Sequence, residues 1–171
     1  MAGMRDPSPA RDGASEGGSS MDNDELLRLL DVAILREVAS YEFYSSVAGK
    51  AANARVREMF AELAGQEKNH EELLTRFRHD PTMRMSFQAP VNYRIAEETA
   101  AAELSPDMKP ADAVAVAMQR ELRAMHFYLD LAEMTAEPQL KELCVSLSNM
   151  EASHKRRLEN LFVEIGYPEA W

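Results

Sequence analysis

The stretch Leu63-Ala-Gly-Gln-Glu67-Lys-Asn-His70 returns 84 residues later as Leu147-Ser-Asn-Met-Glu151-Ala-Ser-His154. In both copies a leucine, a glutamate and a histidine follow one another at spacings of four and three residues, which places them on one face of an α-helix. Apolar residues continue that face in both directions, so the polar pair lies on a stripe that a folded protein buries. Buried helical faces must pack against other helices, and these two segments therefore set the architecture.

The same shift of 84 residues carries Glu37 to Glu121 and Phe43-Tyr44 to Phe127-Tyr128. The four helical stripes comprise Leu30, Ala33, Glu37, Tyr41, Tyr44 and Ala48; Val56, Phe60, Leu63, Glu67, His70, Leu74 and Phe77; Val114, Ala117, Glu121, Met125, Tyr128 and Ala132; and Leu140, Cys144, Leu147, Glu151, His154, Leu158, Leu161 and Ile165. One pattern is thus written twice. We predict an all-α protein, a four-helix bundle made of two repeated antiparallel hairpins.

The domain boundaries follow from the breaks in this pattern. Repeat one spans about 22–79 and repeat two about 110–165, and the break inside each repeat is short enough only to reverse the chain. Residues 80–109 are rich in proline and long enough to climb the whole bundle, which predicts a long crossover. Residues 1–20 are rich in Gly, Ser and Pro without apolar periodicity, so we expect a disordered tail before a folded domain at 21–171.

Composition excludes several classes of function. The 19 basic residues against 29 acidic ones give a formal charge of −10, which disfavours nucleic acid and anionic membranes as partners. No apolar stretch approaches a membrane span. The single cysteine, Cys144, excludes an internal disulfide and any CxxC pair, and we expect it to be a small buried hydrophobe. We interpret the chain as a soluble cytoplasmic protein.

The spacing also predicts where the polar stripe residues meet. Glu37 and Glu67 each lie about 15 residues from the first hairpin turn, or roughly 22 Å along the helix, so they are level with each other. Glu121 and Glu151 bear the same relation to the second turn. Packing the hairpins about a pseudo-two-fold axis then brings six polar residues into one layer near mid-height: Glu37, Glu67, His70, Glu121, Glu151 and His154.

Four carboxylates in one buried layer require cations or protons. Each like-charged pair about 4 Å apart repels by roughly 4 kcal/mol at an effective dielectric constant of 20. Four carboxylates and two neutral imidazoles balance two divalent ions and offer oxygen and nitrogen ligands suited to iron or manganese. A glutamate on each of two helices and Glu-x-x-His on each of the other two is the donor set of di-iron and di-manganese bundles. Tyr44 and Tyr128, seven residues after Glu37 and Glu121, are expected to bond a ligand carboxylate.

These motifs resemble the diiron domain of the rubrerythrins, within the ferritin-like superfamily. The resemblance covers about residues 22–171 and includes Leu104-Ser-Pro-Asp-Met108 and the closing Gly166-Tyr-Pro-Glu-Ala-Trp171. It implies that Glu67 and Glu151 are bridging carboxylates, that Glu37 and Glu121 are more terminal, and that each metal takes one histidine. The same six residues would carry catalysis. The implied cofactor is two Fe ions, with Mn or mixed Fe/Mn possible and Zn able to substitute.

Two departures from the family pattern shape the functional prediction. Rubrerythrins commonly add a rubredoxin domain with paired CxxC motifs, which this chain lacks, and an extra glutamate stands where this chain has Ala124 and, in the first copy, Ser40. We therefore expect an oxidoreductase that reduces peroxide or dioxygen with electrons from an external donor protein, and a homodimer by family resemblance. The alternatives are a ferroxidase or iron-storage protein, and a metal-stabilised sensor or structural bundle.

Overall fold

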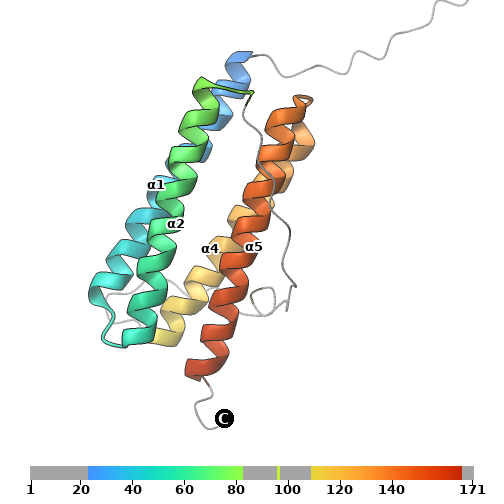
Figure 1. Ribbon diagram of the computed structural model, residues 1–171. Coiled ribbons are helices and arrows are strands. Elements are labelled where there is room, and N and C mark those ends of the chain that lie inside the picture. The colour runs from blue at the N-terminus through green and yellow to red at the C-terminus, as the bar shows by residue number, and fades with distance from the viewer. Residues whose placement is uncertain (1–22, 83–95, 97–108, 167–171) are drawn as a thin grey trace, which may run out of the picture.

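The computed structural model describes residues 23–82, Ala96 and residues 109–166. Within them lie four long helices and no strand (Figure 1), which confirms the all-α prediction. The helices are α1 (Asn23–Lys50), α2 (Ala54–His79), α4 (Pro110–Met134) and α5 (Pro138–Gly166). The predicted tail at 1–20 and most of the predicted crossover at 80–109 lie outside the described residues.

Local sequence signals account for where the helices begin. The side chain of Asn53 accepts a hydrogen bond from the Val56 N–H at 3.2 Å, which caps α2. Pro110 and Pro138 are the first residues of α4 and α5, where a missing N–H costs nothing and the fixed φ suits a helix. The α1–α2 and α4–α5 connections are each only three residues long, so both pairs form antiparallel hairpins.

The two hairpins stand side by side and form the predicted bundle (Figure 1). The backbones approach each other closely within each hairpin and much less between the hairpins. In the view of Figure 1, α1 runs downward, α2 and α4 run upward, and α5 runs downward. The end of α2 and the start of α4 therefore lie at opposite ends of the bundle. The direction of the four helices is consistent with a ferritin-like four-helix bundle.

The apolar core is divided into two clusters along the bundle. One, nearer the α1–α2 turn, includes Phe60 and Met118, and the other, nearer the α4–α5 turn, includes Phe77 and Leu147. All of these side chains are fully or almost fully buried. The residues between the two clusters on each helix are the polar members of the predicted stripes. The fold thus holds a polar layer between two apolar halves.

Two predicted apolar stripe residues belong to neither core cluster, the half-buried Met125 and the exposed Tyr41. Tyr41 is 40 % exposed, whereas Tyr44 on the same stripe is completely buried. Tyr41 lies at the edge of the buried face, where its ring can pack while its hydroxyl stays in water. Cys144, in contrast, is buried as predicted. Among the described residues, no helix combines the length and the apolar character needed to cross a membrane.

Candidate metal centre

Six acidic and imidazole side chains from all four helices meet in the polar layer. Glu37 comes from α1 and Glu121 from α4, while α2 and α5 each contribute a glutamate and a histidine three residues apart. None of the six residues is more than 4 % exposed. The structure thus brings together every residue that the sequence placed in this layer, and leaves none of them out.

The six residues form two overlapping groups. The first group is Glu37, Glu67, His70 and Glu151, and the second is Glu67, Glu121, Glu151 and His154. Within each group, one possible ligand atom from every residue lies within 4.8 Å of the others. Glu67 and Glu151 belong to both groups, and each has two carboxylate oxygens. This arrangement suits two neighbouring cations that share two carboxylates.

The atoms that face each other in this layer do not satisfy one another. Nδ1 of His70 lies 3.1 Å from Oε1 of Glu151, and Nδ1 of His154 lies 3.2 Å from Oε2 of the same residue. Both Nδ1 atoms, both Glu151 oxygens and Oε1 of Glu67 are buried without a hydrogen-bond partner. Buried polar atoms in proteins are nearly always partnered. Lone pairs that converge in this way fit metal ions.

The two histidines also face each other symmetrically. The rings of His70 and His154 are stacked, with centroids 5.2 Å apart and planes inclined by 7°. Nδ1 of His70 lies 3.5 Å from Oε2 of Glu37, and Nδ1 of His154 lies 3.8 Å from Oε2 of Glu121. Each imidazole therefore faces three carboxylates: the two that both groups share, and one that belongs only to its own group.

Without metal, protons balance the charge of the layer. Burial raises the pKa of Glu37 and Glu121 well above the usual carboxyl range, and repulsion from the other carboxylates contributes. For Glu151 burial acts in the same direction, but the charge of His70 and the nearby His154 outweigh it and hold its pKa well below the usual range. Burial would lower the pKa of both histidines, yet the surrounding carboxylates raise it well above normal. Metal ions would displace these protons.

Two tyrosines tie the hairpins together at this level. The hydroxyl of Tyr44 on α1 donates to Oε1 of Glu121 on α4 at 2.6 Å. In return, the hydroxyl of Tyr128 on α4 donates to Oε1 of Glu37 on α1. Burial, and then the negative charge of the neighbouring glutamates, raises the pKa of both phenols well above the usual range, so each keeps the proton that it donates. Each carboxylate is thus held by one oxygen and presents the other to a histidine.

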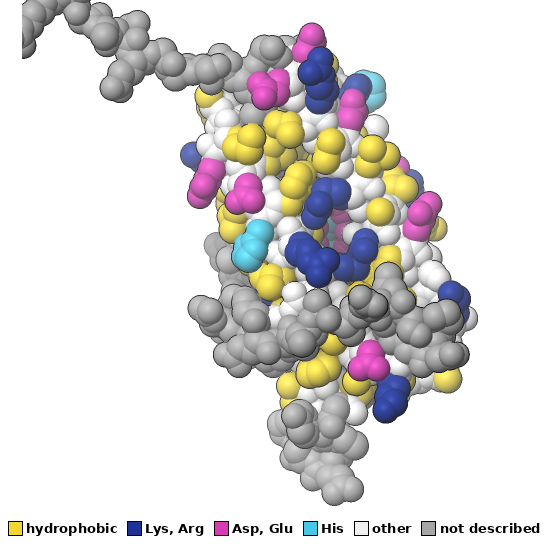
Figure 2. Space-filling view, turned by 180° about the vertical axis from the view of Figure 1, so that it is seen from behind, with side chains coloured by type: hydrophobic (Ala, Val, Ile, Leu, Met, Phe, Trp, Pro, Cys, Tyr) yellow, Lys and Arg dark blue, Asp and Glu magenta, His cyan; other side chains and the backbone are white. Residues whose placement is uncertain are grey.

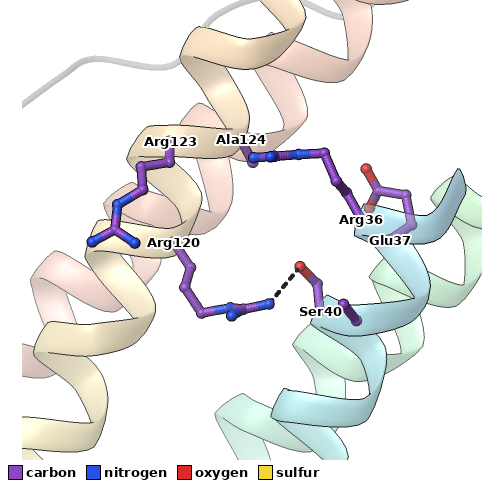
Figure 3. Close-up of a pocket in the computed structure, with 7 residues that line it drawn as sticks. Arg36, Glu37, Ser40, Arg120, Arg123 and Ala124 are labelled. Carbon is purple, nitrogen blue, oxygen red and sulfur yellow. Dashed lines mark hydrogen bonds between the residues drawn. The ribbon is translucent and has the colours of Figure 1, made fainter. Parts of the chain in front are cut away.

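An opening between α1 and α4 reaches this layer, and the sequence analysis did not predict it (Figure 3). It has a volume of about 260 Å³ and is lined by Arg36, Glu37, Ala39, Ser40, Arg120, Arg123 and Ala124. Arg36 and Arg120 directly precede Glu37 and Glu121, so they are equivalent positions of the repeat. Comparing the two repeats residue by residue, outside as well as inside the apolar stripes, would have revealed this pair.

The fold and this layer define a class of protein, the four-helix bundles with a buried carboxylate and histidine cluster able to hold two metals. Comparison with known families is consistent with that class, since the sequence profile described as "Rubrerythrin" matches residues 28–162. The chain belongs to the rubrerythrin family. A similar solved structure is a hypothetical protein from Pyrococcus furiosus, with 30 % sequence identity, a TM-score of 0.63, and coverage of 85 % of this chain and 93 % of that one. No curated protein gives a significant match.

Proposed function

We propose that this protein is a diiron oxidoreductase that reduces peroxide or dioxygen with electrons from a separate donor protein. The observation that supports it most directly is the pair of overlapping groups that share Glu67 and Glu151. Membership of the rubrerythrin family supports the same assignment, since that family implies a diiron site. Each group offers three carboxylates and one imidazole, a donor set suited to Fe or Mn, and Zn can occupy such ligands without redox chemistry.

Two ferrous ions would together supply the two electrons that convert hydrogen peroxide and two protons into two molecules of water. The residues of the chain would hold the two metal ions, orient the carboxylates around them and shield them from water. Glu37, Glu121 and the two histidines each belong to one group, and the two shared glutamates keep the groups adjacent. Tyr44 and Tyr128 fix the terminal carboxylates by hydrogen bonds. The apolar clusters above and below the layer keep bulk water away.

Electrons must reach the site from elsewhere in this proposal. The chain contains a single cysteine and therefore no four-cysteine iron site, which is why a separate protein is assigned the role of donor. The thiol of Cys144 is no substitute, because burial raises its pKa to about 12 and so suppresses the reactive thiolate. A cytoplasmic homodimer completes the proposal.

The test is anaerobic loading with Fe(II), followed by one equivalent of hydrogen peroxide per pair of irons. In the wild-type protein we expect the iron to be oxidised within seconds, as measured by the change in ultraviolet absorbance. A variant with both Glu67→Ala and Glu151→Ala should show only the rate of free iron. A wild-type protein that loads two irons and still does not oxidise them within minutes would contradict the peroxidase assignment.

An iron-uptake titration distinguishes the oxidoreductase from the iron-storage alternative. Successive additions of Fe(II) and oxygen should saturate near two irons per chain if the layer is a catalytic site. A storage protein would instead take up many irons per chain and would form a large particle by size-exclusion chromatography. A sensor or structural bundle would gain stability on metal binding without turnover.

A further inference from the structure

The opening between α1 and α4 is ringed by positive charge although the chain as a whole is strongly acidic. Figure 2 shows Lys or Arg side chains gathered around a hollow on this face, with acidic side-chain atoms visible inside it. The arginines that line the opening are Arg36, Arg120 and Arg123. The formal charge of the chain is −10, so three cations around one hollow form a distinct electrostatic feature.

Among the described residues, carboxylates do not form ion pairs with these arginines. Within the described part of the chain, no carboxylate oxygen lies within 4.0 Å of the guanidinium groups of Arg36, Arg120 or Arg123. Glu37 also lines the opening, but its two oxygens face inward, to the hydroxyl of Tyr128 and to Nδ1 of His70. The carboxylates of the described residues therefore leave the charge of the opening available to an external anion.

Two of the guanidinium groups are held in place by aromatic rings. The guanidinium carbon of Arg36 lies 4.4 Å from the ring centroid of Phe127, and that of Arg120 lies 4.6 Å from the centroid of Phe43. Figure 3 shows Arg36 reaching from α1 toward α4 and Arg120 reaching from α4 toward α1. Each therefore meets a ring on the other hairpin. Stacking covers the face of a guanidinium and leaves its N–H donors, which lie in the plane, free for a ligand. The two groups are pre-organised donors.

The remaining donors also lack strong partners. Nε of Arg120 is buried without a hydrogen-bond partner, and its terminal nitrogen donates only a long bond, 3.4 Å, to Oγ of Ser40. The other lining residues, Ala39, Ser40 and Ala124, are small and leave the space open. The volume of about 260 Å³ is several times that of one water molecule and smaller than most sites for organic ligands. It suits a small ion.

We propose that Arg36, Arg120 and Arg123 form a binding site for a small inorganic oxyanion of the phosphate class, located at the opening between α1 and α4 that reaches the carboxylate and histidine layer. Guanidinium groups bind such anions through paired N–H donors at the spacing of two oxygens. The site does not depend on metal in the layer or on redox activity, so it stands or falls separately from the proposed function.

The experiment is a calorimetric titration of the full-length protein with inorganic phosphate, at constant ionic strength set with chloride. The metal content of each sample is measured beforehand. We expect saturable binding of one phosphate per chain. Arg36→Gln and Arg123→Gln should each weaken the affinity by about tenfold, because each removes charge-assisted hydrogen bonds. Arg120 is left unchanged, since its partly buried side chain contributes to packing.

Arg28→Gln is the matched control. It removes the same charge from an exposed position on the same helix, and Arg28 does not line the opening. Its phosphate affinity should equal that of the wild type, and circular dichroism should show all variants equally helical. Three results would overturn the proposal: no saturable binding, an equal loss in Arg28→Gln, or binding that persists in the double variant Arg36→Gln/Arg123→Gln and disappears on removal of metal.

Discussion

The two hairpins are equivalent inside the polar layer and differ just outside it. In the second hairpin, Lys155 and Glu159 are both almost completely buried, and Nζ of Lys155 donates to Oε1 of Glu159 at 2.9 Å. The equivalent of Lys155 in the first hairpin is Glu71, which pairs with Lys68 at the surface. The second hairpin thus contains a buried ion pair that the first lacks.

The difference follows from what each hairpin must contact. Oε1 of Glu159 also accepts the backbone N–H of Ala96 at 2.9 Å, and Ala96 belongs to the segment between the hairpins. The first hairpin has no equivalent contact among the described residues. The two repeats therefore have the same residues where they meet at the pseudo-two-fold axis. Away from that axis they differ, because, among the described residues, only the second hairpin forms a hydrogen bond with Ala96 in the segment between the hairpins.

The largest effect on metal binding should come from removing either of the two shared carboxylates. Glu67→Ala and Glu151→Ala each remove a residue that belongs to both groups, so each should abolish binding of both metals. Glu37→Ala removes a residue of one group only and should leave one metal bound more strongly than the other. Elemental analysis after loading with zinc and desalting gives the number of metals per chain.

The control for this prediction is Glu58→Ala, an exposed glutamate on α2 outside the layer, which should retain full loading. Helix content by circular dichroism checks that each variant folds. If Glu67→Ala lost both metals while Glu151→Ala kept them, the two halves would not be equivalent and the sharing of both carboxylates would be wrong.

The next effect exploits the buried ion pair that the second hairpin has and the first lacks. Lys155→Met leaves Glu159 buried without its ion-pair partner and should lower the free energy of unfolding by about 3–5 kcal/mol. Glu71→Ala, at the equivalent surface position, should change it by no more than about 0.5 kcal/mol. Urea denaturation of the metal-free proteins measures both.

A second substitution tests the cause. Lys155→Met combined with Glu159→Leu removes both charges and should recover most of the lost stability, except for the hydrogen bond from Ala96. Equal stability losses for Lys155→Met and Glu71→Ala would show that the asymmetry of the hairpins has no energetic weight.

Sequence reasoning succeeded for the duplicated polar residues of the buried stripes and failed for features on which helical periodicity does not report. The six residues of the layer were predictable because helical spacing and the 84-residue repeat both report on buried faces. Lysine is usually solvent-exposed on a helix, yet Lys155 is buried, and its partner Glu159 also accepts a hydrogen bond from Ala96, which is 63 residues away in the sequence. Tyr41 obeys the same periodicity as its buried neighbours, and only the arc that the other helices cover decides that it is exposed. Periodicity gives a direction on a helix but not the width of the buried face.

The pH dependence of metal binding should be the same for both halves. In the metal-free protein the surrounding carboxylates raise the pKa of His70 and His154 and so favour the protonated imidazoles, whereas a ligating imidazole must lose that proton. Metal binding therefore releases protons, and affinity increases as the pH rises, by up to about tenfold per pH unit for each proton released. Zinc titrations at pH 6, 6.5 and 7 measure the slope.

Two histidine variants measure how much each imidazole contributes to the pH dependence of metal affinity. His70→Ala and His154→Ala should each reduce the number of protons released by about one, because the two imidazoles occupy equivalent surroundings. An affinity that does not change with pH in the wild-type protein would contradict the protonated state assigned to the metal-free layer.

The smallest expected effect is the difference in stability between the two equivalent tyrosine variants, which should be close to zero. Tyr44→Phe and Tyr128→Phe each remove one hydrogen bond to a buried carboxyl group, at Glu121 and Glu37 respectively, and each should lower the free energy of unfolding by about 1–2 kcal/mol. The two values should agree within about 0.5 kcal/mol, since both tyrosines are buried to the same extent and occupy equivalent places in the repeat. Tyr41→Phe is the control, because its hydroxyl lies on an exposed side chain and should contribute almost nothing. Urea denaturation of the three metal-free variants makes the comparison. A gap larger than about 1 kcal/mol between the two buried tyrosines would show that the hairpins, although equivalent in sequence here, hold their terminal carboxylates with unequal strength.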